Sequence, residues 1–227
     1  MFQLLLKDVD AVVYVDADAV LLSPLDKMWN YFSRFNSTQM LALVAEHEDP
    51  KMGWYNKQSK IPYFLPLGLN SGVALMNLTR MRQVNFTKAI INYEHTYGRK
   101  LAWFDQDLLN IFCRFSPDRF YQMDCSANYR GDHCAARHVH PNSTCKFADK
   151  HGVLVLHGSK RHFYSNPTLK AVYQTFRTHD LKSDQTAGLL NNLTKNLGQA
   201  KGKSPCRNVS QIFLKHIQEL VFEDDVH

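Results

Sequence analysis

The 227 residues suffice for one sizeable domain, and their hydrophobic content of 44% supports a packed core and excludes general disorder. No apolar stretch reaches the length of a transmembrane helix, and residues 1–6 lack the basic flank of a signal peptide. The net charge is +6, but the basic residues are scattered, which argues against a nucleic-acid binder. An anionic small-molecule substrate accounts for this charge equally well.

Short apolar runs alternate with helical patterns along the chain. Strands are predicted at residues 11–15, 40–45, 73–76 and 152–156, and helices at 27–35, 79–96 (one or two pieces), 108–115, 167–178, 185–197 and 212–222. Residues 46–64 and 116–150 are predicted to be irregular. This alternation predicts a mixed α/β architecture. The unbroken apolar run 11–15 is typical of a strand buried on both faces of a parallel sheet.

Two aspartates, Asp16 and Asp18, directly follow the first predicted strand. Ligands of open α/β sheets bind beyond the carboxyl ends of such strands, and two carboxylates there are costly without a neutralising cation. Oxygen ligands suit Mg²⁺ or Mn²⁺, and these ions are usually shared with substrate phosphates. The pair alone would be better explained as a solvated turn, so the prediction of a metal–diphosphate site depends on the strand before it.

Three more polar groups stand at the ends of predicted elements. They are Asn70-Ser71-Gly72 before a strand, Asp105-Gln106-Asp107 at the start of a helix with Asp105 as its N-cap, and His157-Gly158 after a strand. Each has a simpler interpretation, as turn residues, a helix cap or a strand-end histidine. Considered together, they predict a single site.

The chemistry that fits these groups is glycosyl transfer from a nucleotide sugar. Asp16, Asp18 and neutral His157 would hold a divalent ion on the diphosphate. Gly158, through its N–H, and Lys160 would support the diphosphate oxygens, while Asn70 and residues 105–107 would contact the sugar.

Cysteines and glycosylation sequons point to an oxidising compartment. Six Asn-x-Ser/Thr sequons, more than composition alone would produce, begin at Asn36, Asn77, Asn85, Asn142, Asn192 and Asn208. Asn77 ends an apolar run and is expected to stay unmodified. Cys125, Cys134 and Cys145 cluster in a loop-like stretch, which favours a disulfide of open pairing over zinc binding with His133, His138 and His140. Cys113 lies in an apolar helical pattern and is predicted to be a core thiol.

Six motifs in order resemble the glucoside xylosyltransferases, which are retaining, glycogenin-like glycosyltransferases of family 8 with a GT-A fold. The motifs are LLLKDVDAVVYVDADAVLLSPLDKMW, AEHEDPKMGWYNK, GLNSGVALMNLTRMR, WFDQDLLNIF, CSANYRGDHC and VLHGSKRHFY. The resemblance implies a Rossmann-like, mostly parallel sheet flanked by helices. It also implies Mn²⁺-dependent transfer of xylose from UDP-xylose to O-linked glucose on EGF-like repeats in the Golgi or ER lumen.

The same resemblance assigns roles to residues and to segments of the chain. It makes Asp16, Asp18 and His157 metal ligands and puts Asn70, Gly72, Asp105, Gln106 and Asp107 at sugar-binding and catalytic-face positions. Ser71, Gly158 and Lys160 are assigned to the donor from their place in the chain alone, because the loop after His157 departs from the family pattern. It implies a substitution without a protein nucleophile, in which Gln106 at most stabilises one face of the sugar. Residues 1–180 would form the catalytic domain and 181–227 a helical extension. Family members begin further upstream, so the domain is expected to be N-terminally incomplete, with a membrane anchor expected before it.

Two alternatives remain open from the sequence. A hexosyltransferase of the same fold would use UDP-glucose or UDP-galactose, because the space around the sugar C6 cannot be deduced from the residues. A truncated, inactive fragment would retain the metal ligands without a complete nucleotide pocket.

Overall fold

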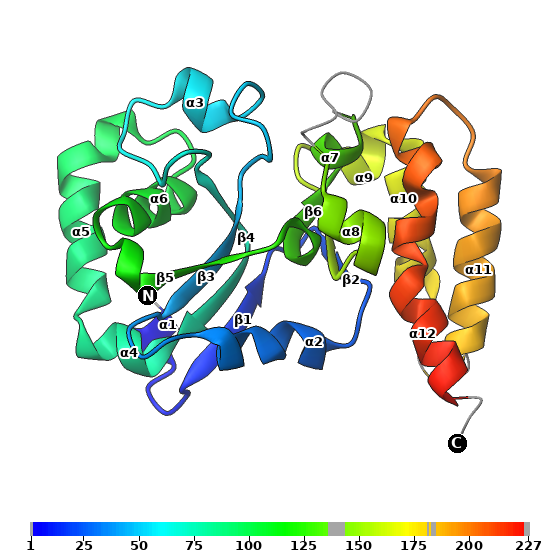
Figure 1. Cartoon of the computed structure of the whole chain (residues 1–227), viewed down its shortest axis with the longest axis horizontal. Helices are drawn as coiled ribbons and strands as arrows, with labels where there is room; N and C mark the ends of the chain where they lie inside the picture. The colour runs from blue at the N-terminus through cyan, green and yellow to red at the C-terminus, as the bar shows by residue number, and fades with distance from the viewer. Residues whose placement is uncertain (1, 136–143, 181, 183–184, 225–227) are drawn as a thin grey trace. The chain divides into compact units, whose positions relative to one another are not determined.

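A computed structural model describes residues 2–135, 144–180, 182 and 185–224. The chain divides into two compact units. The first unit comprises Met1–Val15 and Met28–Asp124, and the second comprises Asp16–Lys27 and Cys125–His227. Each unit has its own sheet and its own helices (Figure 1).

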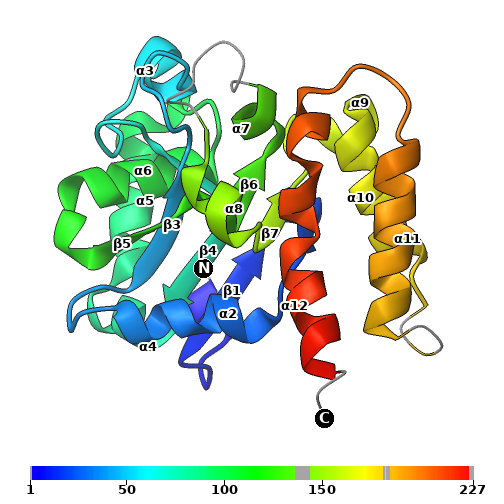
Figure 2. The same cartoon turned by 45° about the vertical axis from the view of Figure 1, so that its right-hand side comes forward.

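The first unit is built on a four-stranded sheet with the order β1-β4-β3-β5. Its strands are β1 (Ala11–Val15), β3 (Leu41–Ala45), β4 (Leu69–Asn77) and β5 (Phe120–Met123). Its α-helices are α1 (Phe2–Leu5), α3 (Trp54–Gln58), α4 (Leu78–Gln83), α5 (Phe86–Tyr97) and α6 (Asp105–Phe115), and its 3-10 helices are η1 (Asn30–Arg34), η2 (Gly98–Lys100) and η3 (Pro117–Arg119). Helices α5 and α6 lie next to one another in both views (Figures 1 and 2).

The core of the first unit lies between its sheet and these helices. Strand β3 is buried along its whole length, which the apolar run at residues 40–45 predicted. The fully buried side chains of the cluster include Leu41 and Leu43 of β3, Leu69 and Ala74 of β4, and Cys113 of α6. Burial raises the pKa of the Cys113 thiol, so this predicted core thiol is confirmed as an inert packing residue.

The second unit contains a three-stranded sheet with the order β2-β7-β6. Its strands are β2 (Ala19–Leu21), β6 (Tyr129–Arg130) and β7 (Val155–His157). Its helices are α7 (Gly131–Ala135), α8 (Lys146–His151), α9 (His162–Ser165), α10 (Pro167–Thr178), α11 (Thr186–Gln199) and α12 (Lys215–Asp224), with the 3-10 helices η4 (Cys125–Asn128) and η7 (Pro205–Phe213); α2 (Leu25–Trp29) starts in this unit and ends in the first. Helices α10 and α11 pack together, and α11 packs on α12 (Figure 2).

The predicted mixed α/β architecture is confirmed, but the prediction of a mostly parallel sheet is wrong. Antiparallel pairing joins β1 to β4, β3 to β4, and β2 to β7, and only β3–β5 and β6–β7 are parallel. Strand β1 is only partly buried, because it ends the strand order of its sheet among the described residues. An apolar run records that a strand is buried, but it does not record the direction of its partner.

Several element predictions are confirmed and others need correction. Helix α10 has the predicted bounds, and residues 79–96 form the two helices α4 and α5. The region predicted as irregular after residue 116 contains β5, β6, α7 and α8, and α3 lies within 46–64. None of the described helices combines the length and the apolar character needed to cross a bilayer. The division of function at residue 180 stays a prediction, and α11 and α12 belong to the same compact unit as β7.

Two disulfides cross-link the second unit. One joins Cys125 to Cys145 and the other joins Cys134 to Cys206. The predicted disulfide is therefore confirmed, and no thiolate of these cysteines remains for zinc. His138 and His140, which the zinc alternative required, lie outside the described residues.

Shortening a side chain in the middle of β3 should destabilise the first unit. We expect Leu43→Ala to lower the free energy of unfolding by about 2–5 kcal/mol, because Leu43 is fully buried between two strands. Leu5→Ala is the control, with a change within about 0.5 kcal/mol, since Leu5 is 77% exposed. Urea unfolding followed by tryptophan fluorescence is the measurement, because Trp29, Trp54 and Trp103 all lie in this unit. Equal midpoints for the two variants would contradict the assignment of β3 to the core.

Candidate metal and sugar sites

Asp16, Asp18 and His157 converge in the second unit, as the sequence predicted. The two aspartates lie in the turn before β2, where the Ala19 N–H donates to the Asp16 carbonyl at 3.0 Å. Strand β2 then pairs antiparallel with β7 in a register that sets Ala19 opposite His157. The register of two short strands thus brings together residues that are about 140 positions apart in the sequence.

The three side chains present their ligand atoms to a common point. His157 Nε2 lies 3.3 Å from Asp18 Oδ1 and 3.5 Å from Asp16 Oδ2. One ligand atom from each residue lies within 4.8 Å of the others. The His157 side chain is 5% exposed, whereas those of Asp16 and Asp18 are 35% and 51% exposed. The histidine of the cluster is therefore buried, and its two carboxylates are accessible to solvent.

Asn128 and Arg130 set the state of the His157 imidazole. The Asn128 side-chain oxygen lies 3.0 Å from His157 Nδ1, and an amide oxygen can only accept, so Nδ1 carries the proton. Burial lowers the pKa of His157, and the positive charge of Arg130 lowers it further, against the opposing effect of the two carboxylates. A neutral ring protonated at Nδ1 turns the lone pair of Nε2 toward Asp16 and Asp18.

This donor set fits a divalent cation. A lone pair that faces two carboxylates is unfavourable by itself and becomes favourable when a cation lies among them. Two carboxylate oxygens and one imidazole nitrogen suit Mn²⁺ or a similar divalent ion. Ligands about 2.1 Å from an octahedral ion lie about 3 Å apart, which is close to the separations that His157 makes with the carboxylates.

The loop after β7 is tied to the same cluster by backbone and side-chain contacts. The Gly158 N–H donates to the Asp18 carbonyl at 2.7 Å, so the prediction that this N–H supports the diphosphate is corrected: the group is already used to fix the aspartate turn. Lys160 Nζ donates to Asp132 Oδ2 at 2.7 Å. Lys160 and Arg161 both have positive φ, which is costly for residues with a Cβ, so their loop is held in an unusual conformation.

A second predicted group assembles in the first unit around Gln106. Gln106 Oε1 accepts hydrogen bonds from Asn70 Nδ2 at 2.9 Å and from the Ser71 N–H at 3.1 Å. The Gly72 N–H donates to Asn70 Oδ1 at 3.1 Å. The sequence had placed Asn70, Ser71 and Gly72 before a strand. They lie within β4 instead, because β4 begins at Leu69. Asn70 and Gln106, both predicted to contact the sugar, are thus in direct contact with one another.

Asp107 is fully buried, and its carboxylate is saturated with hydrogen bonds. Oδ2 accepts from the N–H groups of Ala102 and Trp103 at 2.6 and 2.8 Å, and Oδ1 accepts from the Tyr55 hydroxyl at 2.7 Å. Burial and the Asp107 charge raise the pKa of Tyr55, which keeps this hydroxyl a donor. Gln106 Nε2 also donates to the Tyr55 oxygen at 3.2 Å.

Asp105 does not have its predicted role as the N-cap of α6. The cap residue is Phe104, which makes no side-chain capping bond and has a φ of 42°, and Asp105 is the exposed first residue of the helix. Asp107 satisfies backbone donors before the helix instead, from the third helical position. The N-cap position of α6 therefore lacks the side-chain bond that the sequence predicted, and Asp107 bonds the backbone before the helix rather than its first turn.

The sequence did not single out Tyr55, Asn110 or Asn128 for a role. Asn110 is fully buried and bonds Leu69 through both its amide groups, which fixes the start of β4 against α6. Tyr55 and Asn128 each bond a predicted site residue from a distant segment. Both lie within the quoted motifs, but nothing in their immediate neighbours reveals the partner.

Residues 1–157 match the family described as Glycosyl transferase family 8. Across 96% of its length, the chain is 36% identical to glucoside xylosyltransferase 1 of Gallus gallus and covers 52% of that protein. The chain thus spans about half the length of the curated relatives it matches.

Two solved structures share the fold at low sequence identity. The apo form of mouse xyloside xylosyltransferase 1 gives a TM-score of 0.50 at 20% identity, over 68% of this chain and 59% of the other. The galactosyltransferase LgtC, solved with donor and acceptor sugar analogues, gives 0.51 at 20% identity, over 88% and 66%. The fold is of the GT-A type that these glycosyltransferases share.

The saturated carboxylate of Asp107 should be a structural requirement of the first unit. We expect Asp107→Asn to lower the free energy of unfolding by about 1–3 kcal/mol, because an amide cannot accept from donors on both sides and leaves one of them unpaired. Asp105→Asn is the matched control and should be nearly neutral, since Asp105 is exposed. Urea unfolding monitored by tryptophan fluorescence compares the two, and equal stabilities would contradict the role given to Asp107.

Proposed function

We propose that this chain, which belongs to Glycosyl transferase family 8, transfers xylose from UDP-xylose to O-linked glucose on EGF-like repeats. The reaction retains the anomeric configuration and depends on Mn²⁺. The observation that carries the proposal is the convergence of Asp16, Asp18 and His157, with the Nε2 lone pair of histidine directed at two carboxylates. The similarity to glucoside xylosyltransferase 1 supports the choice of donor and acceptor.

In this proposal, the residues of the second unit hold the metal and the diphosphate. Asp16, Asp18 and His157 would coordinate a divalent cation, which supplies Lewis-acid stabilisation of the departing nucleoside diphosphate. Lys160 follows His157 by three positions and carries a positive charge suited to a phosphate oxygen. Asp132 would orient its ammonium group through their 2.7 Å hydrogen bond.

The residues around Gln106 would bind and orient sugar hydroxyls. The side-chain amides of Asn70 and Gln106 and the backbone N–H of Ser71 form a connected set of polar groups, which is a composition suited to a carbohydrate. The carboxylate of Asp107 is buried and accepts three hydrogen bonds, so it is not free to attack an anomeric carbon. We assign Gln106 to the face of the sugar, Asp107 to the positioning of the loop before α6, and Asp105 to contact with substrate from its exposed position.

This assignment favours a substitution without a covalent glycosyl–enzyme intermediate. A double-displacement mechanism needs an accessible carboxylate nucleophile and a second carboxylate as acid and base. Of the two acids that flank Gln106, only Asp105 is exposed, because Asp107 is buried. The side chain at the centre of the Gln106 cluster is a neutral amide, which is a poor nucleophile. The leaving phosphate would then accept the proton of the acceptor hydroxyl.

Binding of the donor should depend on the metal. We expect calorimetry to detect UDP-xylose binding with Mn²⁺ and none after Mn²⁺ is replaced by EDTA, because the diphosphate has few cationic partners without the ion. UDP-glucose and UDP-galactose should bind more weakly than UDP-xylose, and the reverse order would support the hexosyltransferase alternative. Equal binding with Mn²⁺ and with EDTA would contradict the metal-dependent site.

Single substitutions of the three proposed ligands test the same site. We expect Asp16→Ala, Asp18→Ala and His157→Ala each to abolish Mn²⁺-dependent UDP binding while circular dichroism stays unchanged. Asp26→Ala is the matched control, because Asp26 is an exposed acid in the first turn of α2 in the same unit. Binding retained in all three variants would overturn the assignment of the ligands.

We further propose that the protein acts in the Golgi or ER lumen, and that the longer protein is anchored in the membrane. The disulfides Cys125–Cys145 and Cys134–Cys206 support an oxidising compartment, as does the number of sequons. The structure describes five of the six sequon asparagines, and Asn142 lies outside the described residues.

Glycan occupancy should differ between Asn77 and Asn192. Asn77 is half-buried, and its Oδ1 accepts the Arg80 N–H at 2.9 Å as the cap of α4, so a glycan there would disturb the helix start. Asn192 is exposed on α11. We expect peptide mass spectrometry after enzymatic deglycosylation in oxygen-18 water to label Asn192 and not Asn77. Labelling of Asn77, or of no sequon in protein from a secretory host, would contradict the proposal.

A further inference from the structure

Residues 125–134, here called the bracketed segment, are closed at both ends by disulfides. Cys125 begins η4 and is joined to Cys145 at the start of α8. Cys134 lies in α7 and is joined to Cys206 at the start of η7. The segment contains only η4, the two-residue strand β6 and α7, and helices this short are not stable without external contacts. Its conformation therefore depends on the cross-links and on packing.

The bracketed segment lies along β7, the strand that ends in His157. Strand β6 pairs parallel with β7, in a register that sets Arg130 beside His157. The Leu154 N–H donates to the Ser126 carbonyl at 3.0 Å. Backbone contacts thus fix the segment to the strand that presents the histidine.

Two side chains of the bracketed segment contact residues of the proposed donor site. Asn128, which is fully buried, lies with its Oδ1 3.0 Å from His157 Nδ1. Asp132 accepts the hydrogen bond from Lys160 Nζ. Neither side chain belongs to the metal-ligand cluster, so both act through the residues that they hold.

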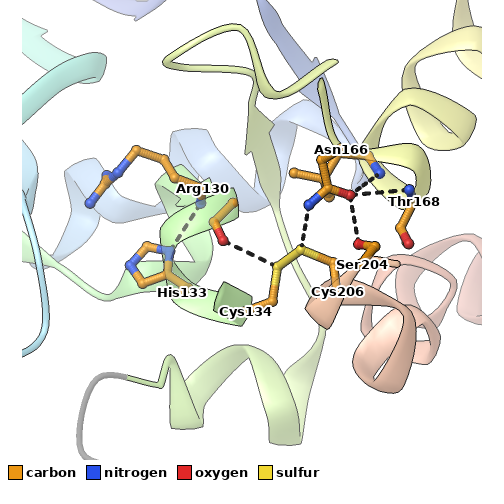
Figure 3. Close-up of a disulfide and its surroundings, with 9 residues drawn as sticks. Arg130, His133, Cys134, Asn166, Thr168, Ser204 and Cys206 are labelled. Atoms are coloured by element: carbon orange, nitrogen blue, oxygen red, sulfur yellow. Dashed lines mark hydrogen bonds between the residues drawn. A yellow bond between two sulfur atoms is a disulfide. The ribbon is translucent and has the colours of Figure 1, made fainter. Parts of the chain in front are cut away.

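The far end of the second disulfide is itself anchored. Asn166 Nδ2 donates to Cys206 Sγ at 3.2 Å, and Asn166 Oδ1 accepts from Ser204 Oγ and from the N–H groups at the start of α10 (Figure 3). At the near end, the Arg130 N–H donates to His133 Nδ1 at 2.9 Å, one residue before Cys134 (Figure 3). The disulfide therefore connects α7 to η7, and hydrogen bonds of Asn166 connect η7 to the N-terminus of the longer helix α10.

We propose that the bracketed segment is the positioning element of the metal-ligand cluster, and that Asn128 is the residue through which it orients His157. The proposal rests on the proposed function, because it takes the cluster as a metal site. Asn128 is a positioning residue: its amide oxygen holds the proton on Nδ1 and leaves the Nε2 lone pair free for the metal. The disulfides keep Asn128 at the distance this requires.

Mn²⁺ binding by a pair of Asn128 variants tests the proposal. Asn128→Leu has a similar size and no acceptor, and we expect its Mn²⁺ affinity to fall about 10- to 100-fold. Asn128→Asp keeps an acceptor for Nδ1–H and should restore most of the affinity. The measurement is titration of Mn²⁺ alone, with free Mn²⁺ followed by electron paramagnetic resonance. Equal affinities of the wild type and Asn128→Leu would overturn the role of Asn128.

A metal-free readout separates this proposal from the proposed function. Long-range proton–nitrogen NMR spectra at pH 7.5, with His157 assigned by its loss in His157→Gln, report which ring nitrogen carries the proton. We expect the Nδ1-protonated form in the wild type and its loss in Asn128→Leu. If the wild type binds no Mn²⁺, the metal site of the proposed function fails, and the spectra still decide the role of Asn128. An unchanged ring form in Asn128→Leu would overturn that role.

The contribution of the second disulfide is tested separately. The double variant Cys134→Ser/Cys206→Ser should bind Mn²⁺ more weakly than Cys113→Ala, which removes a buried sulfur from the first unit without breaking a cross-link. Unchanged affinity in a folded double variant would overturn the positioning role of this disulfide. Should the double variant fail to fold, the Asn128 pair still decides whether the segment acts on His157.

Discussion

The antiparallel register between β2 and β7 is the constraint on which the candidate metal site depends. Ala19 lies opposite His157, and the Gly158 N–H closes onto the Asp18 carbonyl just beyond this pair. A shift by one residue would turn the His157 side chain to the other face of the sheet, away from the carboxylates. Three residue pairs of a short ladder thus determine whether the cluster exists, which explains why the loop after β7 is bonded back to the aspartate turn.

The protonation state of His157 determines what this geometry can bind. A histidine beside two aspartates would ordinarily be protonated and form ion pairs with them. Here burial and Arg130 lower the pKa of His157, and Asn128 accepts from the nitrogen on the far side of the ring. The structure therefore stabilises three converging electron-pair donors, an arrangement that costs free energy unless a cation shares it. That cost is what distinguishes a metal site from a surface salt bridge.

The sequence predicted the residues of the site better than the strands that carry them. Asp16, Asp18 and His157 were predicted because several polar groups at the ends of predicted elements together fit a metal–diphosphate site, although each alone has a structural explanation. Asn70 and Gln106 were predicted from the same combination. The prediction of mostly parallel pairing was wrong, since an apolar run fits parallel and antiparallel pairing alike. Asn128 and Tyr55 were not predicted, because a hydrogen bond between distant segments leaves no local pattern in the sequence.

The two disulfides constrain the segment that contacts the candidate metal site. Elements as short as η4, β6 and α7 do not hold their shape in isolation, so the position of a side chain on them depends on how the segment is packed and cross-linked. The disulfides at the two ends of the bracketed segment restrict its conformation in addition to this packing. The oxidising compartment that we propose would then be required for the orientation of His157, because the acceptor for its ring lies on the cross-linked segment.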